Sequence, residues 1–419
     1  MSSLTFLYAQ SGGVTPVINA SAAAVIETAR AHGCRVLAAQ DGIIGALEER
    51  LIDTQQIKTD QLQALTWTPG GAFGSCRFKL RDPQAQRAEY DRLIEVLRTH
   101  EVDVFLYNGG NDSADTSLKL AEVARQQSLD LKVIGIPKTI DNDLAVTDNC
   151  PGFGTVAKYV ATSILEASLD VMSMASSSTK VFILEVMGRH AGWIAAAGGL
   201  AASKPGDPPQ IILMPEVPLD KAAFLTAVQA SVDTSGYCSI VVSEGVRDAE
   251  GVFLSEAGTT DAFGHRQLGG VAPVLADWVK QSLNFKCHWA LSDYLQRAAR
   301  HIASATDLAQ ARAVGVKAVE LGLAGESGVM PVIRRLGDAP YRWSVEAAPL
   351  AQIANKEKTL PASFIRADGF GITEEARRYL APLIEGESPP PFVQGLPAYF
   401  RPRFERVPQR LPAWSVDAS

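Results

Sequence analysis

One short segment of the sequence places a lysine and two aspartates around a single turn. Residues 137–143 read PKTIDND and directly follow the apolar run LKVIGI at 131–136, which is typical of a buried strand. We expect Pro137 to end the hydrogen-bond ladder of this strand, because proline has no N–H to donate. The side chains that follow would emerge at the carboxyl edge of the sheet, where ligands bind in open α/β folds.

The charged side chains of this segment suit phosphoryl transfer. A lysine pairs with a phosphate, one carboxylate can take the proton of an attacking hydroxyl, and a second can hold Mg²⁺ directly or through water. The residues alone leave another interpretation open, since Asp-Asn-Asp after a proline is also ordinary turn chemistry.

Two further apolar runs end in glycine-rich loops. The run VDVFLYN at 102–108 leads into GGNDS at 109–113 and then into a helical pattern. The run LTFLYA at 4–9 leads into QSGG at 10–13, and Pro16 stands where a helix would have its first residue. Glycines let backbone N–H groups approach an anion, and a helix N-terminus adds partial positive charge. These loops predict a phosphate cradle.

These segments, in their order along the chain, resemble the phosphofructokinase family and, within it, the pyrophosphate-dependent branch. The blocks that carry the resemblance lie between residues 11 and 304 and read SGGVTPVIN, GGAFGSCRF, YNGGNDS, GIPKTIDND, EVMGRHAGW, SEG and YLQRAARHIAS. The resemblance implies reversible phosphoryl transfer from Mg-pyrophosphate to the 1-hydroxyl of fructose 6-phosphate, giving fructose 1,6-bisphosphate and phosphate. In-line attack by the hydroxyl would need no covalent intermediate.

The resemblance also implies an α/β fold of two similar, Rossmann-like domains with largely parallel sheets facing an active-site cleft. We expect residues 1–150 and part of 292–400 to form the phosphoryl-donor (pyrophosphate) domain. Residues 151–291 would form the sugar-phosphate domain, and residues 389–419 a C-terminal tail that wraps the surface.

Alternating patterns along the chain agree with such a fold. Apolar runs that read as strands are VFILEV, QIILMP and CSIVVS, and helical periodicity runs through residues 154–173, 220–233 and 292–314.

Length, charge and cysteine usage set further limits. With 419 residues, 47% of them hydrophobic and 20% charged, the chain can bury two cores of ordinary domain size. A net charge of −7 argues against a nucleic-acid surface. Residues 1–10 lack a signal-peptide pattern, and no run approaches the ~20 apolar residues of a membrane span. The five scattered cysteines fit reduced thiols, so we expect a cytoplasmic enzyme without membrane or nucleic-acid partners.

By resemblance, the segment 137–143 carries the chemistry. Asp141 would be the general base that takes the proton of the 1-hydroxyl, and Asp143 the second carboxylate, which orients the site or helps to hold the metal. Thr139 would contact the sugar or the transferring phosphate. Lys138 stands where ATP-dependent members have glycine, and it would bind pyrophosphate and act in catalysis.

The donor pocket, by resemblance, draws on the other loops. Gly13 would admit the backbone to a phosphate, Arg77 would neutralise the leaving group, and Gly110 would line the same pocket. Asp112 stands where ATP-dependent members have glycine, and its bulk and negative charge would oppose a nucleotide.

Asn111 departs from the family pattern, which usually has aspartate at this position. An asparagine carbonyl can still bind a metal or its water, but without charge. We expect Mg²⁺ as the cofactor, with Asp112 and Asn111 as its candidate ligands and Asp143 as a further carboxylate that could support it.

The sugar side, by resemblance, uses the later blocks. The substrate-binding residues are Thr139, Asp141 and Asp143 together with Met187, Gly188, Arg189, Glu244, Tyr294 and Arg297. Arg189 would also act in catalysis. Tyr294 and Arg297 are one helical turn apart, so both can face one ligand. A second candidate for this last block is FGHRQLGG at 263–270, in which His265 fits loosely but Leu268 stands where an arginine is wanted.

The resemblance favours a homo-oligomer, with a dimer as the expectation, in which basic residues of a neighbouring subunit cap the 6-phosphate. Lys180 and Lys286 are the candidates for that contact. His190, His288 and Trp193 are interpreted as packing or supporting residues.

Two other functions stay open at this point. An ATP-dependent phosphofructokinase is opposed by Asp112 and Lys138. A non-catalytic regulatory subunit or sugar-phosphate sensor is opposed by the intact Asp141. The sequence does not determine the oligomeric state, the preference among sugar phosphates such as sedoheptulose 7-phosphate, or allosteric regulation.

Overall fold

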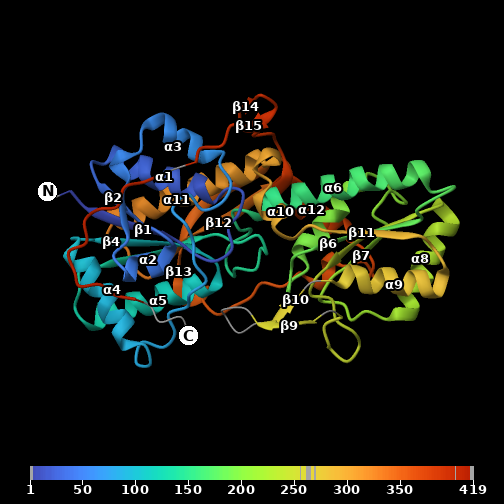
Figure 1. Ribbon diagram of the computed structural model, residues 1–419, viewed down its shortest axis with the longest axis horizontal. Coiled ribbons are helices and arrows are strands. Elements are labelled where there is room, and N and C mark those ends of the chain that lie inside the picture. Colours follow the sequence, from blue (N-terminus) through green and yellow to red (C-terminus); the bar gives the residue numbers. More distant parts are fainter. Residues whose placement is uncertain (1–2, 255, 261–265, 269, 402, 416–419) are drawn as a thin grey trace.

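The structure, a computed structural model, describes residues 3–254, 256–260, 266–268, 270–401 and 403–415. The chain forms two α/β units side by side, each built on its own sheet (Figure 1). The predicted fold class, α/β with largely parallel sheets, is confirmed.

The first unit is built on a sheet of seven described strands in the order β13-β12-β5-β4-β1-β2-β3. The central strands β12, β5, β4, β1 and β2 are parallel, and the edge strands β13 and β3 are antiparallel to their neighbours. The strands are β1 (Thr5–Gln10), β2 (Arg35–Ala39), β3 (Leu51–Asp53), β4 (Val104–Gly109), β5 (Lys132–Pro137), β12 (Val329–Asp338) and β13 (Tyr341–Pro349).

The second unit is built on four parallel described strands in the order β11-β6-β8-β7. These are β6 (Val181–Val186), β7 (Ile211–Leu213), β8 (Cys238–Ser243) and β11 (Cys287–Leu291). Two short antiparallel pairs stand apart from both sheets: β9 (Glu256–Thr260) with β10 (Arg266–Leu268), and β14 (Phe392–Val393) with β15 (Leu396–Pro397).

Helices cover both faces of each sheet, which explains why the central strands are apolar along their whole length. On the first sheet they are α1 (Ile18–Ala31), α3 (Thr59–Thr66) and α11 (Ala305–Leu323) on one face, and α2 (Gly42–Leu47), α4 (Arg87–Thr99) and α5 (Asn111–Gln126) on the other. On the second they are α6 (Phe153–Met174), α7 (Trp193–Ala197) and α12 (Glu374–Leu380) opposite α8 (Lys221–Ser235) and α9 (Val271–Leu283). The short α10 (Asp293–Ala298) follows β11.

Most of the predicted elements are confirmed within a residue or two. The exception is the long helical stretch predicted at 292–314. It divides into α10 and α11, because residues 299–304 leave the α-helix through a short 3₁₀ turn, and Ser304 caps the new helix by accepting a hydrogen bond from the N–H of Asp307.

One local prediction was wrong, and another was right for a different reason. Helix α1 begins at Ile18, two residues after Pro16, which lies in a turn. Strand β5 ends at Pro137, as expected, with Gly109 as its last partner, but the N–H of Lys138 still donates to the carbonyl of Gly109 at 3.1 Å. Alternate residues of a strand face opposite neighbours, so the proline nitrogen faces the β12 side, where the only described pair with β5 is Val329 with Ile134.

The last part of the chain crosses between the units. Strands β12 and β13 complete the first sheet, and residues 360–384 then pack on the core of the second unit. Residues 403–415 return to the first unit and lie along β3 and the neighbouring loops (Figure 1).

Candidate active site

Three loops meet at the carboxyl ends of β1, β4 and β5. These strands are neighbours in the sheet and in register, with Gln10 opposite Asn108 and Gly109 opposite Pro137. The loops are held together by a hydrogen bond from the N–H of Ser11 to the carbonyl of Asn108, at 2.9 Å. The structure therefore brings together the loops that the sequence predicted to form one phosphate cradle.

Cations converge on the backbone of the first loop. The Lys138 ammonium donates to the carbonyl oxygen of Gly13 at 2.5 Å. A Cβ atom on Gly13 would lie 2.9 Å from Nη1 of Arg297 and 3.8 Å from Nη2 of Arg77. The absence of a side chain at Gly13 thus leaves a patch of backbone ringed by three positive groups, which suits a small, highly charged anion.

Lys138 is almost fully buried, with 4% of its surface exposed. The pKa of Lys138 is lowered to about 8, chiefly by burial and also by the positive charges of Arg297 and Arg77, while Asp141 and Asp143 act in the opposite direction. An anion bound beside Gly13 would stabilise the charged form of this lysine.

The two aspartates lie on either side of a tight turn made by Asn142. This residue has a left-handed backbone (φ 56°) and is fully buried, and its side-chain oxygen accepts a hydrogen bond from the N–H of Cys150 at 3.0 Å. Asparagine tolerates this conformation better than most residues. The turn lets Asp141 and Asp143 lie close enough for their charges to interact.

Both aspartates carry a raised pKa. For Asp141 the causes are burial, then repulsion from Asp143 and Glu244, while Lys138 and Arg189 act in the opposite direction. For Asp143 burial is the main cause. Its Oδ1 is buried and makes no hydrogen bond with any described residue. Burying the two neighbouring carboxylates in their charged form is therefore unfavourable, and a divalent cation or a proton would relieve this cost.

The second sheet contributes the loops after β6 and β8. Gly188 has φ 132°, and its N–H lies 3.4 Å from Oε1 of Glu244, while Ser243 Oγ donates to its carbonyl. A Cβ on Gly245 would lie 2.1 Å from the carbonyl oxygen of Arg189, so the two loops pack backbone against backbone. The charges of Glu244 and Arg189 both act on Asp141, which shows that the loops of the two sheets converge.

Helix α10 is joined to this part of the site. Gln296 is fully buried, and its Oε1 lies 3.4 Å from the N–H of Met187. On the outer side of the helix the Arg297 guanidinium lies 3.8 Å over the ring of Tyr294, whose side chain is 60% exposed. The predicted pair is thus in contact, and its arginine reaches across to Gly13 of the first unit.

The two predicted metal ligands are engaged elsewhere. Asn111 uses both ends of its amide, since Oδ1 accepts from the N–H of Asn355 at 2.7 Å and Nδ2 donates to the carbonyl of Lys356 at 2.8 Å. Asp112 pairs with Lys79 at 2.5 Å. No cluster of three or more His, Cys, Asp or Glu side chains suited to a metal is found among the described residues. The unpaired oxygen of Asp143 fits a metal better than either predicted ligand does.

Sequence reasoning missed Lys79 and the segment 355–358. Lys358 is half-buried and donates to the carbonyl of Asp148 at 2.7 Å, and the adjacent Glu357 lies 3.2 Å from His190 across the two units. NKEK reads as a solvated charge run, so no sequence signal pointed to it. Lys79 lies one residue beyond the block that carried the resemblance.

The structure agrees with some of the other sequence-based interpretations and disagrees with others. Trp193 is a core residue, as predicted, with 2% of its surface exposed. His288 is exposed on β11, so the packing interpretation was wrong for it. Lys180 and Lys286 lie together at the amino ends of β6 and β11, at the opposite edge of the sheet from the site. The alternative block at 263–270, including His265, lies largely outside the described residues.

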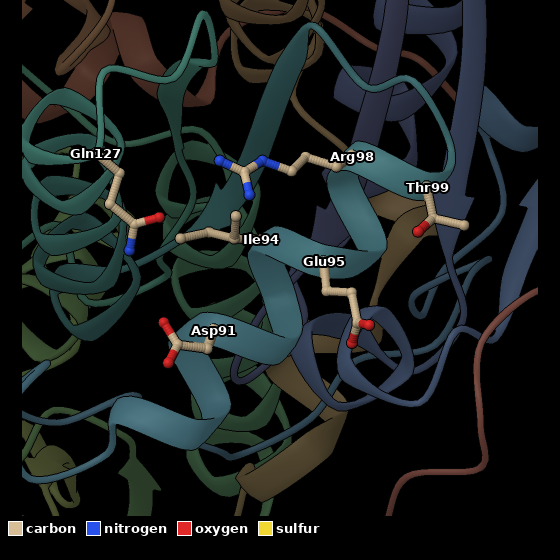
Figure 2. A pocket seen from close by; sticks show the side chains of 6 residues that line it. All are labelled: Asp91, Ile94, Glu95, Arg98, Thr99 and Gln127. Carbon is tan, nitrogen blue, oxygen red and sulfur yellow. The ribbon is translucent and has the colours of Figure 1, made fainter.

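Figure 2 shows a pocket on the outer surface of the first unit. It is lined by five residues of α4 and by the residue that directly follows α5, namely Asp91, Ile94, Glu95, Arg98, Thr99 and Gln127. None of these belongs to the loops described above, so this pocket has no part in the candidate site.

A cradle of cations on one α/β unit, facing a carboxylate pair and the loops of a second unit, is the arrangement of a phosphoryl-transfer enzyme. The phosphofructokinase family model matches residues 5–322, and the chain belongs to this family.

Curated relatives agree over the whole length. The pyrophosphate--fructose 6-phosphate 1-phosphotransferase of Halomonas elongata is 60% identical over 98% of both chains. The protein of the same name from Xanthomonas campestris is 59% identical over 99% of this chain and 100% of its own. The crystal structure of the pyrophosphate-dependent phosphofructokinase from Nitrosospira multiformis superposes with a TM-score of 0.91 at 53% identity, covering 99% of this chain and 100% of that one. Within the part of the chain that the structure describes, no helix is long and apolar enough to cross a membrane.

Proposed function

We propose that the protein transfers a phosphoryl group reversibly between pyrophosphate and the 1-hydroxyl of fructose 6-phosphate. The products in the forward direction are fructose 1,6-bisphosphate and phosphate. The observation that carries this proposal is the position of Asp141, whose charge interacts with Lys138 on its own unit and with Arg189 and Glu244 on the other.

Pyrophosphate binds, in this proposal, to the loops of the first unit. Its oxygens accept hydrogen bonds from the backbone around Gly13 and from Lys138, Arg77 and Arg297. We assign residues 1–150 and the strands at 329–349 to this donor domain.

Fructose 6-phosphate binds to the second unit, which we assign to residues 151–291 with the later segment that packs on it. Glu244 accepts hydrogen bonds from sugar hydroxyls, and Met187 and Gly188 shape the wall of the site. Tyr294 and Arg297 lie at the boundary between the two substrates.

The reaction is an in-line displacement. The 1-hydroxyl oxygen forms a bond to the nearer phosphorus of pyrophosphate, and the bridging P–O bond breaks, so that its electron pair leaves with phosphate. The hydroxyl proton passes to the Asp141 carboxylate. Lys138 and Arg189 stabilise the charge that spreads over the transferring group.

Mg²⁺ is the cofactor we propose. It would enter with pyrophosphate and contact the protein through few carboxylates, as Mg²⁺ commonly does at phosphates. Asp143 supports such a site because its Oδ1 is buried and has no partner among the described residues. Bound Mg²⁺ would neutralise charge on the donor.

The choice between pyrophosphate and ATP depends on the residues at positions 112 and 138. The Asp112 carboxylate is held by Lys79 at 2.5 Å, so its repulsion of a nucleotide is weaker than that of a free carboxylate. The pair nevertheless adds bulk beside Gly110 where ATP-dependent members have only glycine. Steric exclusion, together with the added cation at Lys138, therefore favours pyrophosphate over ATP.

We also propose a cytoplasmic homodimer. All five cysteines are free thiols, as expected in a reducing compartment. Because Lys180 and Lys286 lie at the edge away from their own site, they could meet only a sugar phosphate that is bound by another copy of the chain.

Initial rates test the function directly. Purified protein is given fructose 6-phosphate, Mg²⁺ and either pyrophosphate or ATP, and fructose 1,6-bisphosphate is measured in a coupled assay. We expect turnover with pyrophosphate, and with fructose 1,6-bisphosphate plus phosphate in reverse. Turnover with ATP alone would favour the nucleotide-dependent activity, and no turnover with either donor would favour a sensor.

A further inference from the structure

The C-terminal segment 403–415, here called the strap, lies across the first unit as a strip of extended chain. Its Arg406 pairs with Ile52 in an antiparallel bridge, and the N–H of Val407 donates to the carbonyl of Leu51 at 2.8 Å. The strap thus adds to the β3 edge of the sheet and passes along the outer side of the first unit (Figure 1).

A buried carboxylate holds the middle of the strap. Glu49 is 1% exposed and accepts hydrogen bonds from the N–H groups of Arg410 at 2.6 Å and Leu411 at 3.0 Å, and from His100 at 2.7 Å. These bonds hold the pKa of Glu49 below its usual value against the effect of burial. The strap is therefore docked by specific polar contacts.

The far end of the strap has a separate anchor. The Arg92 side chain donates to the carbonyl of Pro412 at 3.0 Å, and its guanidinium lies 5.7 Å from the centre of the Trp414 ring. This anchor lies at α4, and neither residue touches the donor loops.

The near end of the strap covers the start of the loop that bears Arg77. The ring of Phe404 stacks on Phe73, with centres 5.2 Å apart and planes 25° from parallel. The other side of Phe73 meets Tyr8 of β1 edge-on at 6.1 Å. Phe73 is consequently 1% exposed, and Phe404 supplies part of that cover.

From Phe73 the chain leads to the donor site through a series of backbone contacts. The carbonyl of Phe73 accepts from the N–H of Asp41 at 2.8 Å. Ser75 Oγ donates to the carbonyl of Gly12 at 2.8 Å, and the N–H of Gly12 donates to the carbonyl of Cys76 at 3.0 Å. Arg77 comes next. The loop is thus fixed at one end by aromatic stacking and at the other by Gly12.

We propose that Phe404 of the strap is a positioning residue for pyrophosphate, acting through Phe73 to hold the loop that carries Arg77. The role rests on the proposed function, because it concerns the donor of that same reaction. Loss of the stack would let the loop shift, and a displacement of the order of 1 Å at a binding group can cost about 100-fold in rate. The sugar site, built on the other unit, would be unaffected.

The experiment compares KM values of four proteins: wild type, Phe404→Ala, Phe404→Tyr and Trp414→Ala. Trp414→Ala is the matched control, since it removes an aromatic anchor of the same strap away from the donor loop. We expect Phe404→Ala to raise KM for pyrophosphate about fivefold or more at an unchanged KM for fructose 6-phosphate. Phe404→Tyr keeps the stack and should restore wild-type behaviour, and Trp414→Ala should lower the melting temperature without changing either KM.

Equal increases in both KM values, no change in either, or the same pyrophosphate effect in Trp414→Ala would overturn the inference. If Phe404→Ala does not fold, Phe404→Leu is measured with the same criteria. Inactive wild-type protein with pyrophosphate would instead refute the proposed function, so the two failures are distinguishable.

Discussion

The Lys138 ammonium donates a hydrogen bond to the carbonyl of Gly13 at 2.5 Å, which joins the loop after β5 to the loop after β1. The charges of Asp141, Asp143 and two arginines all act on the pKa of this lysine. It therefore connects the base of the proposed reaction with the anion site.

Lys138→Met keeps the length of the side chain and removes its charge. We expect kcat/KM for pyrophosphate to fall about 100-fold, as when other preorganised groups that stabilise a transition state are removed. Steady-state kinetics with pyrophosphate varied would measure this effect, with Lys317→Met, a half-buried lysine of α11 away from the site, as a control. An unchanged kcat/KM would exclude Lys138 from the donor site.

Asp141→Asn removes the proposed base. We expect kcat to fall by about 10²–10⁴. The change also removes one of several buried negative charges, so the protein should become more stable by roughly 1–2 kcal/mol above the raised pKa of Asp141. Thermal unfolding at several pH values tests this, with exposed Asp233→Asn as the control.

The sign of this stability effect follows from the direction of the shift. A protein with a carboxyl whose pKa is raised in the folded state loses stability as pH rises from the usual pKa of that group, near 4 for aspartate, up to the raised value, which is about 7 for Asp141. The gain from Asp141→Asn should therefore grow with pH and vanish in acid. A gain that is constant with pH would contradict this explanation.

The pH profile of kcat/KM should be bell-shaped. Asp141 must be ionised to act as a base, and its raised pKa moves the acid limb above the usual range of aspartate near 4. Lys138 must be charged to bind phosphate, and its pKa of about 8 sets the alkaline limb. Lys138→Arg should shift that limb to higher pH, and an acid limb near pH 4 in the wild type would be inconsistent with the proposed base.

Gly13→Ala tests the anion patch by size. The added Cβ would lie 2.9 Å from the Arg297 guanidinium and would fill the space above the backbone. We expect KM for pyrophosphate to rise about tenfold, equivalent to roughly 1.4 kcal/mol of binding. Gly337→Ala near the end of β12 is the control, and an unchanged KM in Gly13→Ala would place the donor elsewhere.

Asn111→Asp restores the residue usual in the family, yet it should destabilise this protein. A carboxylate cannot donate to the carbonyl of Lys356, so two oxygens would face each other where a 2.8 Å hydrogen bond exists now. The bond is exposed, so the expected cost is about 0.5–1.5 kcal/mol, the usual net contribution of one hydrogen bond. Denaturant unfolding measures it, and an equal or greater stability would mean that the segment 355–358 is free to move away.

The sequence predicted the site's chemistry better than its supporting contacts. Gly13, Lys138 and Asp141 belong to contiguous blocks at strand ends, where strand polarity alone places them at one edge of the sheet. The partners of Asn111 and Asp112 come from residues 355–356 and from Lys79, and tertiary packing decides them.

For the fold as well, local sequence patterns predicted the regular elements, while features that depend on distant contacts were missed. Apolar runs and their alternation with helical periodicity identified the parallel sheets. The break between α10 and α11 was missed because alanine-rich sequence around residues 298–303 is compatible with a continuous helix. The strap has no periodicity of its own, so its position along β3 depends on contacts with distant groups such as Glu49.

Donor preference is the most direct measure of the roles of Asp112 and Lys138. Rates with pyrophosphate and with ATP are compared for the wild type and for the double variant Asp112→Gly with Lys138→Gly, at saturating fructose 6-phosphate and Mg²⁺. We predict that the wild type uses pyrophosphate alone and that the variant loses this preference. Equal use of ATP by the wild type, or an unchanged preference in the variant, would contradict the roles assigned to Asp112 and Lys138.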